Sequence, residues 1–295
     1  MGKFRAATTL AAFLGLTLPL MPVQAVFVRT SLRLARWFPH WYHRRVCRLI
    51  GVRLHIKGAV VSGKPVLLVA NHSSWLDIPV LSAVAPLSFV AKKEVGAWPF
   101  VSALARLQRT VFVDRERRSA VGEAAGEMIR RLSEGDAVVL FAEGTSTDGN
   151  RVLPFKTSLF AAAKPSKGVG SGPAADAVVQ TVSVVYTKLH GVPLGRADRP
   201  LVGWYGDMEM TSHAWALLGA GPIDVTIRVG DPVPLRDFGD RKELARRTED
   251  EVREGVVRIL RNRDGNDALA VVRPAEASSR PASAHRSAGE RVRFT

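Results

Sequence analysis

Short, continuously apolar runs alternate with longer segments of helical character between residues 55 and 265. The run VLLVA at 66–70 is typical of a strand buried on both faces. Such strands, alternating with helices, predict an α/β domain with a largely parallel sheet flanked by helices. The expected strands are 66–70, 87–91, 110–113, 137–141, 178–186 and 223–229, and the expected helices are 77–85, 98–107, 118–133 and 241–261.

An uncharged stretch of 23 residues, from Ala6 to Val28, precedes this domain. A membrane-spanning helix needs about 20 apolar residues, so the stretch is long enough to be a membrane-anchoring helix. Pro19 and Pro22 would kink its second half, which leaves a re-entrant or interfacial helix open. A cleaved secretory signal is the rival interpretation, because the residues at 23–25 resemble a cleavage site.

Arginines and aromatic residues are interspersed over residues 27–50, and they favour a retained anchor over a cleaved signal. Residues 1–76 hold eleven Lys and Arg and no acid, which is most of the net charge of +15. A basic segment rich in Trp and Tyr suits the headgroup layer of an anionic membrane. A helix packed on its own domain, or a nucleic-acid arm, is the alternative. We expect an anionic membrane surface and no nucleic acid as partner, with the domain on the cytoplasmic side of the inner membrane.

These patterns divide the chain into three parts. We expect a membrane anchor with a basic interfacial segment at 1–54, the α/β domain at 55–265 and a disordered tail at 266–295. Residues 164–177 are rich in Gly, Pro and Ser and predict a mobile loop within the domain. The lone Cys47 excludes a disulfide scaffold and a Cys-rich zinc site, and we expect no metal.

A histidine and an aspartate five residues apart, His72 and Asp77, bracket the turn between the first expected strand and helix. A neutral imidazole with a carboxylate partner is a general base. A capping box formed by Ser74 and Asp77 explains the aspartate without catalysis, and the spacing is common by chance. The His72–Asp77 spacing therefore indicates a catalytic site only if polar residues at the ends of other strands support it.

Two later strands also end in polar residues. Arg115 follows the strand at 110–113, where it could clamp a phosphate or carboxylate or make an ordinary salt bridge. Glu143, Gly144 and Thr145 follow the strand at 137–141, where they could bind a hydroxylated ligand or form only a turn and cap. The carboxyl ends of parallel strands lie at one edge of a sheet, so these clusters predict one site.

Together the motifs resemble those of the glycerolipid acyltransferase family, which includes the 1-acylglycerol-3-phosphate acyltransferases. The family's NHx4D, aromatic–aliphatic–Asp–Arg and FPEGT blocks, and its later aliphatic–Pro–aliphatic strand, match four segments here in order and spacing. The matching segments are Asn71–Asp77, Phe112–Arg115, Phe141–Ser146 with Phe155-Lys156, and Val182–Tyr186.

The resemblance implies that the protein moves an acyl chain from acyl-CoA or acyl-carrier protein to a lysolipid hydroxyl. His72 would be the base and Asp77 its partner. The resemblance implies that the reaction needs no cofactor, because acyl-CoA or acyl-carrier protein is a co-substrate. The implied substrate-binding residues are Arg115, Glu143, Gly144, Thr145, Lys93 and Lys156.

Three positions depart from the family pattern, namely Ala142 and Ser183 in place of Pro, and Ser146 in place of a phosphate-recognising Arg. A serine gives one neutral hydrogen bond where arginine gives a charged bidentate clamp. The first expectation is 1-acylglycerol-3-phosphate as acceptor. The alternative is lyso-ornithine lipid, because residues 148–156 and 204–210 also resemble that bacterial subgroup. Lys93, Arg115 and Arg151 could still meet a phosphate.

Two other classes of protein are weaker alternatives. A non-catalytic membrane-surface or nucleic-acid-binding protein would use the basic arm but leaves the strand-end clusters unexplained. An exported hydrolase would need a nucleophilic serine in a strand–turn–helix elbow, and the sequence contains no G-x-S-x-G.

Overall fold

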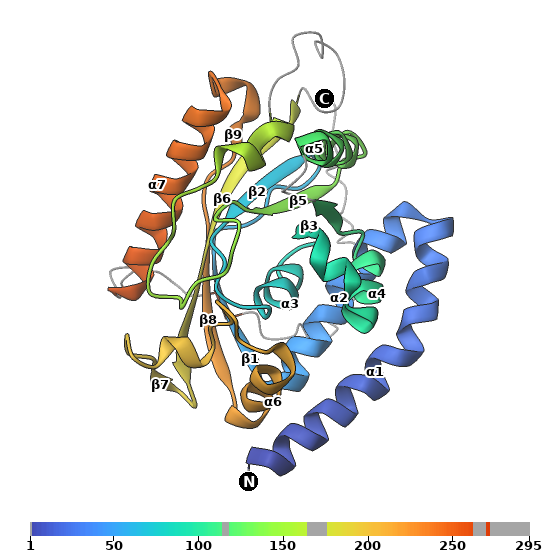
Figure 1. Cartoon of the computed structure of the whole chain (residues 1–295), viewed down its shortest axis with the longest axis vertical. Coiled ribbons are helices and arrows are strands. Elements are labelled where there is room, and N and C mark those ends of the chain that lie inside the picture. The colour runs from blue at the N-terminus through green and yellow to red at the C-terminus, as the bar shows by residue number, and fades with distance from the viewer. Residues whose placement is uncertain (1, 114–117, 164–175, 262–269, 272–295) are drawn as a thin grey trace, which may run out of the picture.

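The computed structural model describes residues 2–113, 118–163, 176–261 and 270–271, with the backbone alone at 118–125, 161–163 and 270–271. These residues form an α/β fold in which helices cover both faces of one twisted sheet (Figure 1). Arg115, most of the loop expected at 164–177, and nearly all of the tail expected at 266–295 lie outside the described residues.

The elements follow the alternation expected from the sequence. The helices are α1 (Gly2–Thr30), α2 (Leu32–Ile50), α3 (Asp77–Ser82), α4 (Pro99–Leu107), α5 (Arg118–Ser133), α6 (Met210–Ala220) and α7 (Arg241–Leu260). Short 3-10 helices are η1 (Lys93–Ala97), η2 (Thr157–Ala163), η4 (Arg199–Leu201) and η5 (Leu235–Asp237). The strands are β1 (Val52–Lys57), β2 (Val66–Ala70), β3 (Leu87–Lys92), β4 (Val111–Val113), β5 (Ala137–Phe141), β6 (Val178–Leu189), β7 (Val192–Pro193), β8 (Ile223–Val229), β9 (Val233–Pro234) and β10 (Ala270–Val271).

The sheet is largely parallel, which confirms the expected fold class. Its order is β10-β1-β8-β6-β2-β5-β3-β4, with β2 between β5 and β6 and parallel to both. The main departure is the antiparallel pairing of β6 with β8. β6 runs three residues beyond its expected end because Leu189 still pairs with Ile223 at the start of β8.

The central strand β2 is fully buried because each face of the sheet has its own helices. Leu67 and Val69 pack with side chains of α5 and α7 on one face. Leu68 and Ala70 face the opposite way, toward side chains of α2, α3 and α6. This arrangement explains why the strand has no polar position.

The helices α1 and α2 form a pair that packs on the domain. α1 contacts α2, α4 and α6, and its Arg5 donates to the carbonyl oxygens of Ile50 and Leu218. α2 begins at the Ser31 cap and ends at Gly51, whose φ of 84° is in the left-handed region that glycine adopts readily. Residue 55, where we expected the domain to begin, lies inside β1.

Candidate active site

The turn after β2 brings His72 and Asp77 together: Nδ1 of His72 lies 2.8 Å from Oδ2 of Asp77. A carboxylate accepts here, so Nδ1 carries a proton, and in the neutral imidazole Nε2 carries the lone pair. Half of the expected capping box also forms, because the same oxygen accepts from the backbone N–H of Ser74 at 3.0 Å. The Ser74 hydroxyl instead accepts from the N–H of Leu76. Asp77 therefore shapes the turn and contacts the histidine at once.

Asp77 is fully buried, and the surrounding donors compensate its charge. Oδ2 accepts from the N–H of Ser73 at 2.8 Å, and Oδ1 accepts from the hydroxyl of Tyr186 at 2.6 Å. Burial, with the neighbouring carboxylate, raises the pKa of the Tyr186 phenol well above its usual value. The phenol therefore stays protonated and donates. In the sequence, Tyr186 is only the last residue of a matched strand segment, and nothing there predicts its hydrogen bond to Asp77.

The imidazole of His72 stacks on the ring of Phe141, with 4.1 Å between the centroids and 20° between the planes. Phe141 in turn stacks against Phe89 of β3 at 6.2 Å. These contacts hold one face of the histidine ring while its side chain remains 18% exposed. The ring is therefore fixed in orientation yet open on the side that lines a cavity.

The backbone of His72 is held by the segment after β5. Its N–H donates to Oε1 of Glu143 at 2.8 Å, and its carbonyl accepts from the N–H of Thr147 at 3.0 Å. The second Glu143 oxygen accepts from the N–H of Leu153 at 2.7 Å. Burial raises the pKa of the Glu143 carboxyl to about 7. Glu143 thus connects the two motif segments through backbone amides, and the described lining of the cavity does not include it.

The side chain of Asn71 extends the β2–β6 ladder past the point where the β2 backbone turns away. Its Nδ2 donates to the carbonyl of Val184 at 2.9 Å, and its Oδ1 accepts from the N–H of the same residue at 2.8 Å. The backbone groups of β6 stay paired, so His72 leaves the sheet at a defined place.

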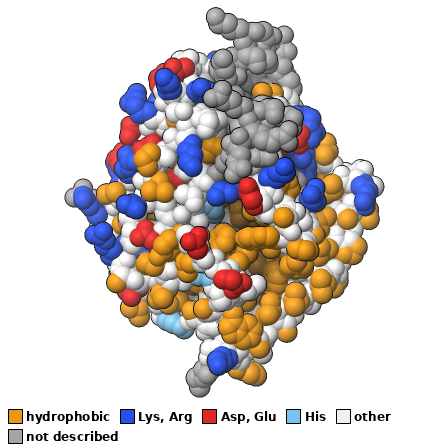
Figure 2. Space-filling view, in the orientation of Figure 1, with side chains coloured by type: hydrophobic (Ala, Val, Ile, Leu, Met, Phe, Trp, Pro, Cys, Tyr) orange, Lys and Arg blue, Asp and Glu red, His pale blue; other side chains and the backbone are white. Residues whose placement is uncertain are grey.

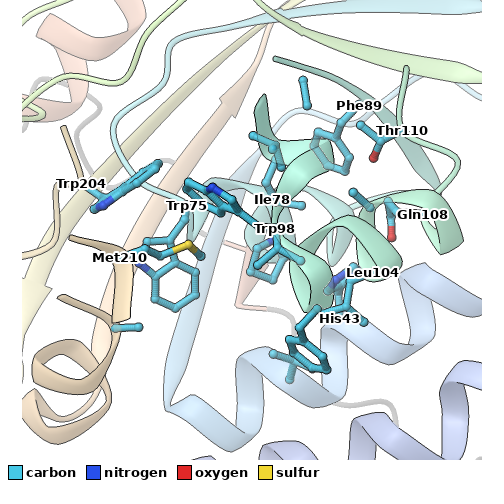
Figure 3. Close-up of a pocket in the computed structure, with 18 of the residues that line it drawn as sticks. His43, Trp75, Ile78, Phe89, Trp98, Leu104, Gln108, Thr110, Trp204 and Met210 are labelled. Carbon is cyan, nitrogen blue, oxygen red and sulfur yellow. The ribbon is translucent and has the colours of Figure 1, made fainter. Parts of the chain in front are cut away.

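His72 lines a cavity of about 790 Å³. Figure 3 shows part of the lining of this cavity. Most of its wall is apolar and comes from α1, α2, α3, α4, β3 and α6, with Phe13, Ile78 and Leu104 among the residues that line it. Polar groups gather where the segment after β5 contributes Gly144, Thr145, Ser146 and Lys156. An apolar chain fits such a wall, and a polar headgroup fits the other end.

The expected site residues fall into four groups. Asp77 and Glu143 bind His72 from outside the described lining of the cavity. His72, Gly144, Thr145 and Lys156 meet at the cavity. Two exposed lysines, Lys92 and Lys93, lie where β3 meets η1. The described lining of the cavity includes Lys92 but not Lys93, which is the one we expected there. Arg115 lies outside the described residues.

The three departures from the family pattern lie in different surroundings. Ser146 lines the cavity, and Ala142 is fully buried. The hydroxyl of Ser183 donates to the carbonyl of Val252 in α7 at 3.0 Å, on the opposite face of the sheet from His72. Of the three, only Ser146 is placed to contact a substrate.

Comparison with known proteins agrees with this geometry. A family model described as Acyltransferase matches residues 51–185. The lyso-ornithine lipid O-acyltransferase of Brucella abortus is 47% identical over 252 residues, which cover 85% of this chain and 94% of that protein. The chain belongs to the acyltransferase family. The resemblance inferred from the motifs is therefore confirmed.

Other acyltransferases show how far the similarity extends. The lyso-ornithine lipid O-acyltransferase of Rhizobium meliloti is 41% identical, covering 88% of each chain. The 1-acyl-sn-glycerol-3-phosphate acyltransferase of Neisseria gonorrhoeae is 30% identical, covering 64% of this chain and 68% of that one. The crystal structure of the Thermotoga maritima LPA acyltransferase PlsC shares the fold, with a TM-score of 0.61 and 23% identity over 88% of this chain and 98% of that one.

Proposed function

We propose that this acyltransferase moves an acyl chain from an acyl thioester to the free hydroxyl of lyso-ornithine lipid. The observation that carries the choice of acceptor is the 47% identity with a lyso-ornithine lipid O-acyltransferase over nearly its whole length. Ser146 supports it, because a neutral side chain lines the cavity where the phosphate-specific pattern has arginine. Of the two expected acceptors, the proposal favours lyso-ornithine lipid, whose headgroup is an amino acid, over 1-acylglycerol-3-phosphate.

His72 is the general base of the proposed reaction. Nε2 takes the proton of the lysolipid hydroxyl as its oxygen attacks the thioester carbonyl, so a C–O bond forms and the C–S bond breaks. The imidazolium then returns the proton to the departing thiolate. Asp77, 2.8 Å from Nδ1, stabilises the transient positive charge. General-base assistance of this kind contributes about 10²–10⁴-fold to the rate.

The remaining cavity residues have separable roles. The apolar wall formed by the helices takes the acyl chain, because burying methylene groups there removes them from water. Gly144, Thr145, Lys92 and Lys156 also line the cavity, and in the proposal they bind the acceptor headgroup. Glu143 acts through the His72 backbone as a positioning residue. The acyl donor is acyl-CoA or acyl-carrier protein, and no cofactor takes part.

In this proposal the protein binds a membrane with an outward-facing apolar surface formed by α1 and α2. α1 is the helix among the described residues that is long and apolar enough to cross a membrane. It turns Thr9, Thr17 and Gln24 toward the protein, while Leu18 and Val26 are exposed. Hydrophobic side chains gather over the part of the molecule where α1, α2 and α4 lie (Figure 2). This inverted pattern suits a helix that faces lipid.

Basic and aromatic side chains of α2 suit the headgroup layer. Trp37 and Trp41 are exposed, as are Arg33, Arg45 and Arg48, and the Arg45 guanidinium lies 5.4 Å from the Trp41 ring centroid. The exposed arginines support an anionic leaflet as the surface that α2 contacts, and the proposal puts the domain on the cytoplasmic side of the inner membrane. Because α1 also lines the cavity, the proposal keeps it attached as an anchor.

An acyl-transfer assay on membranes tests this function. Wild type and His72→Ala would receive lyso-ornithine lipid and 1-acylglycerol-3-phosphate in parallel, each with labelled acyl-CoA and acyl-carrier protein. We expect faster, His72-dependent labelling of the ornithine acceptor. Faster labelling of the phosphate acceptor would assign the enzyme to phospholipid synthesis, and near wild-type turnover by His72→Ala would overturn the mechanism.

A further inference from the structure

Three tryptophans from separate segments meet beside the cavity: Trp75 on the turn after His72, Trp98 before α4 and Trp204 before α6 (Figure 3). The rings of Trp98 and Trp204 lie edge to face, with 6.0 Å between centroids and 76° between planes. We call this group the tryptophan cluster. Its members come from positions far apart in the chain, so only the fold assembles it.

Two of the rings are held in place by their own N–H groups. Nε1 of Trp75 donates to Nδ1 of His213 at 3.1 Å, and Nε1 of Trp204 donates to the carbonyl of Met208 at 2.8 Å. Their polar edges are thus occupied within the protein, and both rings line the cavity. Rings fixed in advance lose little entropy when a ligand binds.

The tryptophan cluster also keeps a defined position relative to His72. The backbone N–H of Trp204 donates to the carbonyl of Ser73 at 2.8 Å. The preceding Gly203 packs so closely on the next loop that an added Cβ would lie 3.2 Å from the carbonyl oxygen of Thr147. Thr147 is the residue whose N–H binds the carbonyl of His72. A headgroup bound at the tryptophan cluster is therefore held in a defined position relative to His72.

Charged side chains of both signs line the same cavity. Glu94 lies on η1, four residues before Trp98, while Lys92 and Lys156 supply positive charge. Acidic side chains are set among the hydrophobic ones on this face (Figure 2). A phosphate headgroup would use only the lysines. An ornithine headgroup bears both an ammonium and a carboxylate, and it would use both signs.

We propose that the π faces of Trp98 and Trp204, together with Glu94, bind the side-chain ammonium of the ornithine headgroup, while Lys92 and Lys156 bind its carboxylate. Aromatic faces attract cations through the ring quadrupole, and a carboxylate adds to the attraction. This inference rests on the proposed function and deepens it, because it names the chemical groups by which the acceptor is selected.

The test compares lyso-ornithine lipid with an analogue whose side-chain ammonium is N-acetylated and therefore neutral. Wild type is expected to prefer the charged acceptor in kcat/KM by about 2- to 30-fold, the range of a cation–π contact. Trp98→Leu keeps an apolar side chain but removes the π face of residue 98, so it should abolish most of the preference for the charged acceptor. Glu94→Gln should reduce it, and Trp98→Phe should retain part of it.

Trp215→Leu is the matched control, because Trp215 is an exposed tryptophan of α6 outside the described lining of the cavity. It should keep the wild-type preference. An unchanged preference in Trp98→Leu, or a wild type indifferent to N-acetylation, would overturn the inference while leaving lyso-ornithine lipid as the acceptor. Wild type that transfers to neither ornithine acceptor but acylates 1-acylglycerol-3-phosphate would instead overturn the proposed function, and this inference with it.

Discussion

The hydroxyl of Tyr186 donates a 2.6 Å hydrogen bond to the oxygen of Asp77 that His72 does not use. Tyr186 lies on β6 and Asp77 at the start of α3, 109 residues away in the chain. Both side chains are buried. The bond stabilises the charged carboxylate, which in turn orients the imidazole.

Replacing this hydroxyl should weaken catalysis. Tyr186→Phe leaves Oδ1 of Asp77 buried with one donor fewer, so the carboxylate orients His72 less firmly, and we expect kcat/KM to fall by about 10-fold. The loss should appear in kcat rather than in KM, because Tyr186 lies outside the described lining of the cavity. Tyr42→Phe removes another buried hydroxyl, bonded to Thr17 at 2.7 Å, and should leave kcat unchanged. An unchanged kcat in Tyr186→Phe would contradict the assignment.

Glu143 should make the stability of the protein depend on pH. Burial raises the pKa of its carboxyl to about 7 in the folded state, above the usual value of 4.5, so the folded state binds the proton more tightly. The resulting stabilisation is present below about pH 4.5 and is lost as the pH rises through about 7. Glu143→Gln cannot titrate. The unfolding free energy of wild type minus that of the variant should therefore decrease between pH 5 and 8, and a constant difference would contradict the expectation.

A buried ion-pair cluster fixes α2 to the domain, and breaking it should cost stability. Asp136 is buried between Arg36 of α2 and Arg109, whose Nη1 lies 3.0 Å from Oδ2 of the aspartate. Asp136→Ala leaves the buried Arg109 with fewer partners, which should reduce the unfolding free energy by about 3–5 kcal/mol. Asp250→Ala, in an exposed pair with Arg246 at 3.9 Å, should change it by less than about 1 kcal/mol. Thermal or denaturant unfolding in detergent compares the two, and equal losses would refute the prediction.

The outward surface of α1 should control membrane binding. Val26 is 55% exposed on the outward side of this apolar helix. Val26→Glu places a charge where the proposal puts lipid, so the fraction of protein bound to anionic vesicles should fall. Val257→Glu makes the same change at an exposed valine of α7 and should leave binding unchanged. Vesicle co-sedimentation measures both variants, and equal binding would remove α1 from the membrane-facing surface.

Local patterns were enough to predict most of the elements. The expected helix 118–133 and the strands 137–141 and 223–229 match α5, β5 and β8 residue for residue. Helical and strand periodicities are set by neighbouring residues, so they are readable without the fold. The antiparallel pairing of β6 with β8 was not predicted, because both directions of pairing use the same apolar runs.

The candidate site divides in the same way. His72 and Asp77 were found because they lie only five positions apart along the chain. The bonds of Glu143 to the His72 backbone, and of Trp204 to Ser73, join residues distant in the chain, and no spacing in the sequence reports them. We expected Lys93 to bind substrate, whereas the described lining of the cavity includes its neighbour Lys92. Consecutive side chains at the end of a strand point to opposite faces, and the sequence does not report which of them faces the cavity.

The sequence alone is enough to predict the apolar strands, the amphipathic helices, the long apolar α1 segment and the His72–Asp77 pair, since each depends on residues close along the chain. Three other features appear only in the fold: Tyr186 supports Asp77, Gln24 of α1 donates to the carbonyls of Ala35 and Leu107, and tryptophans from three segments line one cavity. They could not be predicted because a buried polar group finds its partner wherever the fold supplies one, however far away that partner lies in the chain.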